Sequence, residues 1–115
     1  MSTIYKIMSE AEWVKAKADG EFAGAEIDLA DGYIHFSTAQ QVRETAAKHF
    51  ANRADLVLLS VNSDGLGAAI KWEPSRGGDL FPHLYGNLIV GDVALVDALP
   101  LSESGEHVFP EHVAR

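Results

Sequence analysis

Two segments of the chain carry apolar residues at the spacing of a helix that buries one face. The first lies between Ser9 and Gly20, where Ser9 and Glu12 have the spacing of a capping box and Gly20 is suited to end a helix. Its apolar stripe consists of Ala11, Val14 and Ala18. The second begins at Thr38, which Gln41 follows at the same capping spacing. Its stripe consists of Val42, Ala46 and Phe50. The pattern therefore predicts two capped helices.

Runs of apolar and β-branched residues between turn signals predict short strands. The predicted strands are residues 3–8, 33–37, 55–61, 69–73, 87–90 and 93–99. Residues 55–61 are the most apolar and are expected to lie at the centre of a sheet. The last two strands are expected to pair across Gly91 and Asp92, and residues 21–32 are expected to be irregular. Because strands outnumber helices and do not alternate strictly with them, the pattern predicts an α+β fold with a mostly antiparallel sheet.

Composition supports one globular domain. The chain has 115 residues, of which 47% are hydrophobic and 23% charged. Such a chain is long enough to bury one core, so we expect a single domain over residues 1–115, with its core in about 3–99 and a polar tail in 102–115. The absence of cysteine excludes disulfides and thiol catalysis.

Charge narrows the expected partners. Nine basic residues against 17 acidic ones give a net charge of −8, and the basic residues form no cluster. We therefore expect no general binding to nucleic acids or to anionic membranes. No apolar run is long enough to span a bilayer, and the N-terminus lacks the pattern of a signal peptide, which predicts a cytoplasmic protein. A pocket for one small molecule remains compatible with this charge.

The first candidate for a chemical site is the strand at residues 33–37. Alternation puts Tyr33, His35 and Ser37 on one face, with Ile34 and Phe36 on the other. A phenol, an imidazole and a hydroxyl in one row can all hydrogen-bond to a ligand. The alternative is that His35 is a half-buried residue tied to a backbone carbonyl and that Ser37 only caps the following helix.

The second candidate is the end of the strand at residues 69–73. Glu73 lies beside the large indole of Trp72 and before the rigid Pro74. These neighbours would raise the pKa of its carboxyl group or hold the carboxylate in place against a developing cation. The alternative is a solvated pair of Lys71 and Glu73 on the face of a sheet.

The third candidate is the segment that follows Pro74 in the sequence. Arg76 precedes two glycines and would contact an anionic group, while His83 and Tyr85 alternate in the segment that follows and would face one cleft. The alternative is a flexible hairpin loop followed by aromatic residues of the core. No histidine pattern typical of a metal site is present, so no metal is expected. The remaining histidines, His49, His107 and His112, are expected to be structural or solvated.

Four segments together resemble a known family. They are Ile4-Tyr5-Lys6-Ile7, Gly32-Tyr33-Ile34-His35-Phe36-Ser37-Thr38, Trp72-Glu73-Pro74 and Gly78-Asp79-Leu80-Phe81-Pro82-His83-Leu84-Tyr85-Gly86. They resemble the bacterial family called domain of unknown function nine-five-two, over residues 3–99. That family is grouped with the ADP-ribosyltransferase-like folds. The resemblance implies two small, mostly antiparallel sheets around a cleft, with two capped helices.

The resemblance also implies a ligand and roles for single residues. The histidine-containing strand looks like one in RNA 2′-phosphotransferases, which use NAD. In that superfamily a polar residue of the second strand orients the nicotinamide ribose, and a later glutamate stabilises an oxocarbenium-like transition state. By resemblance, Tyr33, His35 and Ser37 match the former, Glu73 matches the latter, and NAD is the implied cofactor or ligand.

Three functions follow as hypotheses. The first is a small enzyme for an NAD-like, nucleotide-like or ribose-containing ligand, the second a non-catalytic module that binds such a ligand, and the third a protein-interaction domain with an apolar patch over residues 81–85. For the enzyme, the predicted catalytic residues are His35, Glu73 and His83. The predicted ligand-binding residues are Tyr33, Ser37, Trp72, Arg76 and Tyr85.

Overall fold

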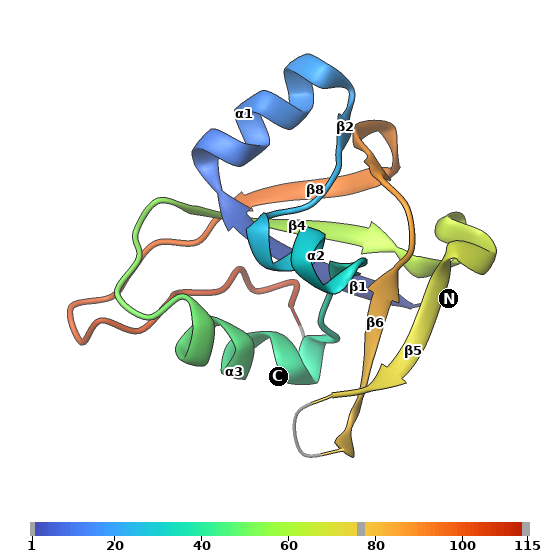
Figure 1. The fold of residues 1–115 in the computed structure, drawn as a ribbon. Helices are drawn as coiled ribbons and strands as arrows, with labels where there is room; N and C mark the ends of the chain where they lie inside the picture. Colours follow the sequence, from blue (N-terminus) through green and yellow to red (C-terminus); the bar gives the residue numbers. More distant parts are fainter. Residues whose placement is uncertain (1, 76–77, 114–115) are drawn as a thin grey trace.

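The computed structural model, which describes residues 2–75 and 78–113, consists of small antiparallel sheets and a few short helices (Figure 1). The first sheet has the order β1-β4-β8, with strands Thr3–Ser9, Leu56–Asn62 and Val93–Ala98. The second has the order β3-β6-β5, with strands Ile34–His35, Leu80–Leu84 and Ile70–Pro74. A two-stranded sheet pairs β2 with β7, which are Glu21–Phe22 and Leu88–Ile89. The predicted α+β class is therefore confirmed.

The two predicted helices are present as α1 and α3, which span Glu10–Asp19 and Ala39–His49. At the start of α1, the Ser9 hydroxyl accepts the N–H of Glu12 at 3.0 Å, and the Glu12 carboxylate accepts the N–H of Ser9 at 2.9 Å. At the start of α3, the side chain of Gln41 accepts the N–H of Thr38 at 3.0 Å. These bonds satisfy amides that have no partner within the helix. Both predicted helix starts are confirmed.

The prediction that residues 21–32 are irregular is wrong. This segment contains β2 and a third helix, α2 (Glu26–Asp31). α2 has only six residues, and its N-cap residue Ala25 has no polar side chain to cap the helix. Instead, the carboxylate of Asp28 accepts the N–H of Ala25 at 2.8 Å. A helix this short, with no apolar stripe facing the core, leaves no periodic signal in the sequence.

The prediction that residues 87–90 and 93–99 pair with each other is also wrong. β7 pairs with β2, whereas β8 pairs with β4 in a different sheet. A short 3-10 helix, Val90–Asp92, carries the chain between the two sheets, and the N–H of Val90 donates to Gly20 at 3.0 Å. A second 3-10 helix, Ser63–Ala69, connects β4 to β5.

The predicted strand at residues 33–37 is shorter than expected, because only Ile34 and His35 belong to β3. Ser37 instead exchanges two backbone hydrogen bonds with Tyr5 of β1, at 2.8 and 2.9 Å. This contact joins the strand that carries His35 to the edge of the first sheet.

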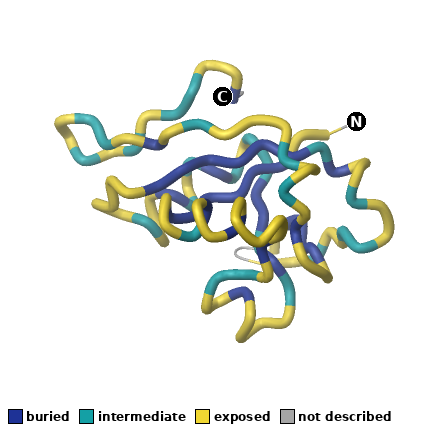
Figure 2. Tube along the Cα trace, turned by 90° about the horizontal axis from the view of Figure 1, so that it is seen from above, coloured by how far each residue is buried: buried dark blue, intermediate teal, exposed yellow. Residues whose placement is uncertain are grey.

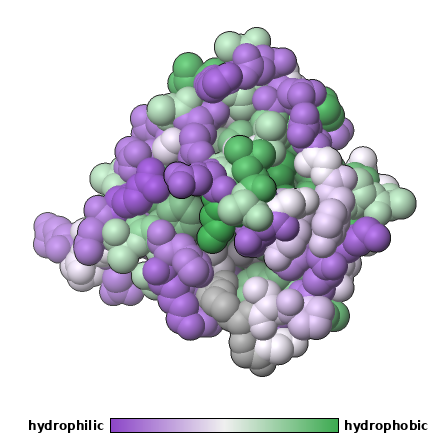
Figure 3. Space-filling view, viewed as in Figure 1, coloured by the Kyte–Doolittle hydropathy of each residue, from purple (hydrophilic) through white to green (hydrophobic). Residues whose placement is uncertain are grey.

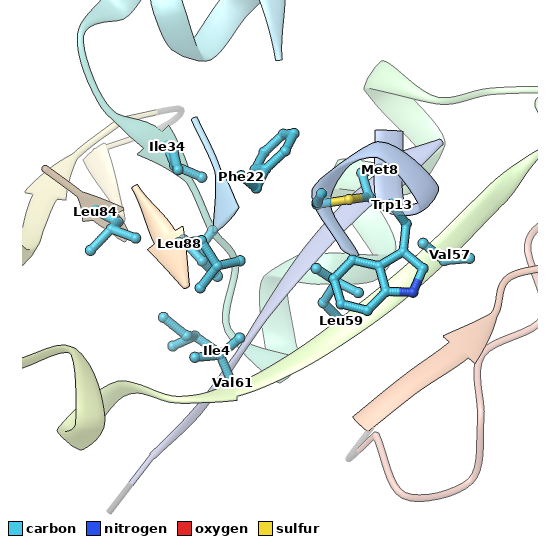
Figure 4. Packing of buried hydrophobic residues seen from close by; sticks show 12 residues of the cluster. Ile4, Met8, Trp13, Phe22, Ile34, Val57, Leu59, Val61, Leu84 and Leu88 are labelled. Carbon is cyan, nitrogen blue, oxygen red and sulfur yellow. The ribbon is translucent and has the colours of Figure 1, made fainter. Parts of the chain in front are cut away.

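In the first sheet β1 and β4 are buried on both faces, and β4 is the central strand, as predicted. Alternate residues of β1 and β4 point to two separate hydrophobic clusters. The first cluster includes Ile4, Met8, Trp13, Phe22, Ile34, Phe36, Val57, Leu59, Val61, Leu84 and Leu88 (Figure 4). The second includes Tyr5, Ile7, Val42, Ala46, Leu56, Leu58, Leu99 and Val113. In Figure 2 these central strands are the buried part of the tube, and the exposed segments lie around them.

The C-terminal segment packs against the second cluster. Val113 is buried, and its carbonyl accepts a hydrogen bond from Arg43 of α3 at 3.2 Å. The guanidinium of Arg43 also lies 4.9 Å from the ring centroid of Phe109. The tail is therefore anchored to the face of α3. Within the described ranges, no helix is both long enough and apolar enough to cross a membrane.

Candidate functional site

One face of the β3-β6-β5 sheet carries a row of aromatic and ionisable side chains. His35 of β3 lies opposite His83 of β6, which lies opposite Lys71 of β5. By alternation, the neighbours Tyr33, Glu73 and Tyr85 belong to the same face. The opposite face carries residues of the first hydrophobic cluster, which are Ile34, Leu84 and the half-buried Ile70. One face of this sheet thus packs on the core while the other presents polar chemistry.

Four rings on this face contact one another, and we call Tyr33, His35, His83 and Tyr85 the ring cluster. Tyr33 is central, with its ring stacked on His83 at a centroid distance of 4.0 Å. The ring of Tyr33 also lies 4.7 Å from that of His35 and 5.3 Å from that of Tyr85. The two histidine rings meet edge to face at 5.6 Å. Two segments far apart in the sequence therefore bring their imidazoles together.

Glu73 connects two members of the ring cluster. One carboxylate oxygen, Oε1, accepts the Tyr85 hydroxyl at 2.7 Å and lies 2.8 Å from Nδ1 of His83. The His83 side chain is only 4% exposed, whereas that of Glu73 is 36% exposed. A carboxylate can only accept, so this contact places the proton of a neutral His83 on Nδ1.

These hydrogen bonds set the protonation of Glu73 and Tyr85. The Tyr85 hydroxyl, followed by His83, lowers the pKa of Glu73 because both stabilise its ionised form. The same hydrogen bond raises the pKa of Tyr85 to about 12, since removal of the phenol proton would put two negative charges together. Burial, followed by the charges of Asp31 and Glu73, raises the pKa of Tyr33. Near neutral pH the site therefore contains an ionised Glu73 between protonated phenols.

His35 is held by two carboxylates from α2. Its Nδ1 lies 2.5 Å from Oδ1 of Asp28, and its Nε2 lies 2.9 Å from Oδ2 of Asp31. The side chain of Asp28 is 1% exposed, whereas that of Asp31 is 44% exposed. Nδ1 of His35 thus has a buried partner, and Nε2 has an accessible one.

Asp28 is the most heavily bonded side chain of the site. Besides the His35 ring, it accepts the backbone N–H of His35 at 3.1 Å and that of Ala25 at 2.8 Å, and it pairs with the buried Lys6 at 3.0 Å. Burial would raise the pKa of Asp28, but the hydrogen bond from His35 and the charge of Lys6 hold this pKa well below its usual range. Burial lowers the pKa of Lys6, and the charge of Asp28 opposes that effect. This pair ties α2, β1 and β3 together beneath the ring cluster.

The structure brings together five of the eight residues predicted for the site. They are Tyr33, His35, Glu73, His83 and Tyr85. Ser37 does not join them, since it is buried and its hydroxyl lies 3.1 Å from that of Thr45 on α3. Trp72 is 40% exposed and, by alternation, lies on the sheet face opposite to Glu73. Arg76 lies outside the described residues.

Sequence reasoning did not find Asp28, Asp31 or the role of Lys6. The two aspartates follow no recognised motif, and Lys6 interrupts an apolar strand. That interruption was the available signal, because a lysine between Ile4 and Met8 on a buried face requires a carboxylate partner.

Two hollows lie at opposite ends of β6. One, of about 240 Å³, is lined by Ala23, Asp28, Leu29, Gly32, Tyr33, Ile34, Gly86 and Asn87. The other, of about 340 Å³, is lined by Thr38, Gln40, Gln41, Glu44, Asp79, Leu80 and Phe81. Figure 3 shows hydrophobic side chains gathered over the position of α2, where Ile27 and Leu29 are exposed. Among the described residues, no group of three or more histidines and carboxylates is arranged to hold a metal ion.

The fold and this site define a small α+β protein with antiparallel sheets, few helices and a histidine–carboxylate face. The chain belongs to the DUF952 family, described as proteins of unknown function, whose model matches residues 7–96. The family indicated by the motifs is thereby confirmed.

Solved structures from Caulobacter crescentus share the fold. The X-ray structure of protein CC0527 has a TM-score of 0.93 and 50% sequence identity, covering 97% of this chain and 98% of that chain. The solution NMR structure of CC0527 has a TM-score of 0.84 and 53% identity, covering 92% and 91%. No curated protein matches the sequence.

Proposed function

We propose that this chain is a small enzyme that acts on an NAD-like, nucleotide-like or other ribose-containing ligand bound against the ring cluster. The observation that carries the proposal is the position of Glu73. Its carboxylate is oriented by Tyr85 and His83, remains partly accessible and lies beside stacked aromatic rings. A fixed anion next to aromatic faces suits a flat or cationic group whose positive charge grows during the reaction.

The lowered pKa of Glu73 defines its role. A carboxyl group that stays ionised cannot donate a proton near neutral pH, so Glu73 acts as an electrostatic stabiliser of an oxocarbenium-like centre. His83 is the acid–base group, because the Glu73 contact at Nδ1 leaves Nε2 to exchange a proton. Tyr33 offers a ring face to a base or to a sugar.

The resemblance to ADP-ribosyltransferase-like folds supports the same ligand class. Glu73 lies on the later strand β5, the position that the resemblance gives to the glutamate. The accessible carboxylates of Asp31 and Glu73 suit the positively charged nicotinamide ring.

The experiment combines ligand screening with one substitution. NAD, ADP-ribose and a panel of nucleotides are tested for thermal stabilisation and, by mass spectrometry, for product. Glu73→Gln keeps the shape but removes the charge, so we expect turnover to fall about 100-fold or more while binding is largely retained. Glu103→Gln, an exposed change in the tail, is the control and should behave like wild type. Unchanged turnover in Glu73→Gln, or no product from any ligand, contradicts the proposal.

The binding-module alternative has its own supporting observation. The polar groups of the site already satisfy one another, as in the Tyr85–Glu73–His83 and Asp28–His35–Asp31 sets. Stabilisation by a ligand without any product would establish this alternative. Phe81 is buried, which argues against an interaction domain built on an exposed patch at residues 81–85.

A further inference from the structure

The two carboxylates at His35 differ in how firmly they are held. Asp28 is buried and bonded to Lys6 and to the backbone amides of Ala25 and His35, so its contact with Nδ1 is part of the folded framework. Asp31 is 44% exposed and contacts Nε2, which belongs to a ring that is itself 30% exposed. Solvent and ligands therefore have access to the second contact but not to the first.

Asp31 can leave this position at little cost. It is the last residue of α2 and precedes Gly32, which ends the helix with a positive φ of 88°. Exposed ion pairs contribute little to stability, because water competes for both partners. The buried contacts of Asp28 keep α2 and His35 in place when Asp31 moves.

We propose that Asp31 is an exchangeable occupant of an oxyanion position, and that a carboxylate or phosphate oxygen of a ligand replaces it as the acceptor of the His35 Nε2–H. An oxyanion has the same acceptor chemistry and charge sign as the Asp31 oxygen now 2.9 Å from this nitrogen. The inference rests on the proposed function only in taking the ring cluster as the ligand site.

The neighbours of His35 give the position an orientation. The ring of Tyr33 lies 4.7 Å from that of His35, and the ring of His83 lies 5.6 Å away. An oxyanion at Nε2 is therefore at the edge of the ring cluster, and the remainder of the ligand extends over Tyr33. Asp31 and Glu73 repel an incoming anion, so Asp31 competes for the nitrogen and also raises the concentration at which the anion binds.

The test compares Asp31→Asn with wild type by NMR titration of the histidine ring signals. Inorganic phosphate and acetate are the probes, and they distinguish a phosphate position from a carboxylate position. Loss of one exposed competing charge should tighten binding at His35 about two- to fivefold. Asp19→Asn is the matched control, because Asp19 forms an exposed pair with Lys15 away from the site and its loss changes the net charge equally.

Equal affinity in Asp31→Asn and wild type overturns the inference, as does a response that spares His35 or is absent for both probes. Where the His35 signals do respond, His35→Gln, with folding checked by thermal unfolding, should abolish the response of its neighbours Tyr33 and His83. Oxyanion binding of this kind without any ribosyl ligand leaves the inference standing and removes the proposed function. Turnover of a ribosyl ligand, together with equal oxyanion affinities in Asp31→Asn and wild type, supports the proposed function and overturns this inference.

Discussion

At the scale of single residues, Asp28 shows how one side chain can support both the fold and the site. Its burial is costly, and that cost is offset by a lysine, an imidazole and two backbone amides. The same bonds fix the orientation of the His35 ring, since Nδ1 has a permanent acceptor. The main effect of a substitution at Asp28 should therefore be a loss of folding stability, and any effect on the reaction at the site should be secondary.

We predict that Asp28→Asn lowers the free energy of unfolding by about 3–5 kcal/mol, because it leaves Lys6 buried without a counter-charge. The folded pKa of Asp28 lies below its unfolded value of 3.8, so its contribution is present above that value and is lost as pH falls through the folded pKa. The difference between wild type and variant should accordingly shrink below about pH 4. Urea unfolding at several pH values measures this, and a loss under about 1 kcal/mol at pH 7 would contradict it.

At the scale of elements, the sequence predicted the helices and strands that neighbouring residues specify through capping or periodicity. The capping residues Ser9 and Thr38, together with apolar stripes, indicated α1 and α3 at their correct starts. Strand alternation correctly grouped Tyr33 with His35 and His83 with Tyr85. α2 was missed because its stability comes from the contacts of Asp28 with distant strands, and such contacts leave no periodicity. The pairing of β7 with β2 was also missed, because these two strands are far apart in the sequence and no local pattern links them.

Gly24 controls the position of α2, and Gly24→Ala should disturb it. Gly24 has a φ of +125°, and a Cβ there would lie 2.9 Å from the Cβ of Asp28. Gly20 also has a positive φ, of +84°, but a Cβ there meets nothing within 4 Å. Gly20→Ala should therefore cost only the left-handed strain of about 1–2 kcal/mol. Gly24→Ala should cost more and should also shift the NMR signals of His35.

Both variants place an alanine at a positive φ, and Gly24→Ala adds the contact with Asp28, which a shift of the His35 signals reports. Equal losses of stability, with unchanged His35 signals in both, would show that α2 does not depend on close packing at Gly24.

At the scale of the whole molecule, the first sheet separates the site from the tail. The β3-β6-β5 sheet packs on the first hydrophobic cluster through Ile34 and Leu84, which lie on its face opposite the site. The C-terminal segment covers the second cluster, through Leu99 and Val113. This division could not be predicted from composition, because the polar tail has few apolar residues and their partners are distant in sequence.

We predict that Val113→Ala destabilises the protein by about 1–2 kcal/mol, since it removes buried methyl groups from the second cluster. Val108→Ala is the control, because Val108 is 49% exposed and its loss should cost less than about 0.5 kcal/mol. Thermal or urea unfolding measures both. The ring signals of His35 and His83 should be unchanged in either variant, and a shift there would show coupling across the sheet.

The alternation of β1 has one more consequence, which concerns misfolding. Between Ile4 and Met8 both faces of this strand are apolar except at Lys6, so the hydrophobic alternation alone does not fix its pairing register. A slip of one position would turn the Lys6 ammonium away from Asp28 and towards the second hydrophobic cluster, which includes Val42 and Leu58. Burying an unpaired ammonium there would cost so much free energy that the shifted register is excluded. A single lysine therefore specifies the register of β1 in the central sheet.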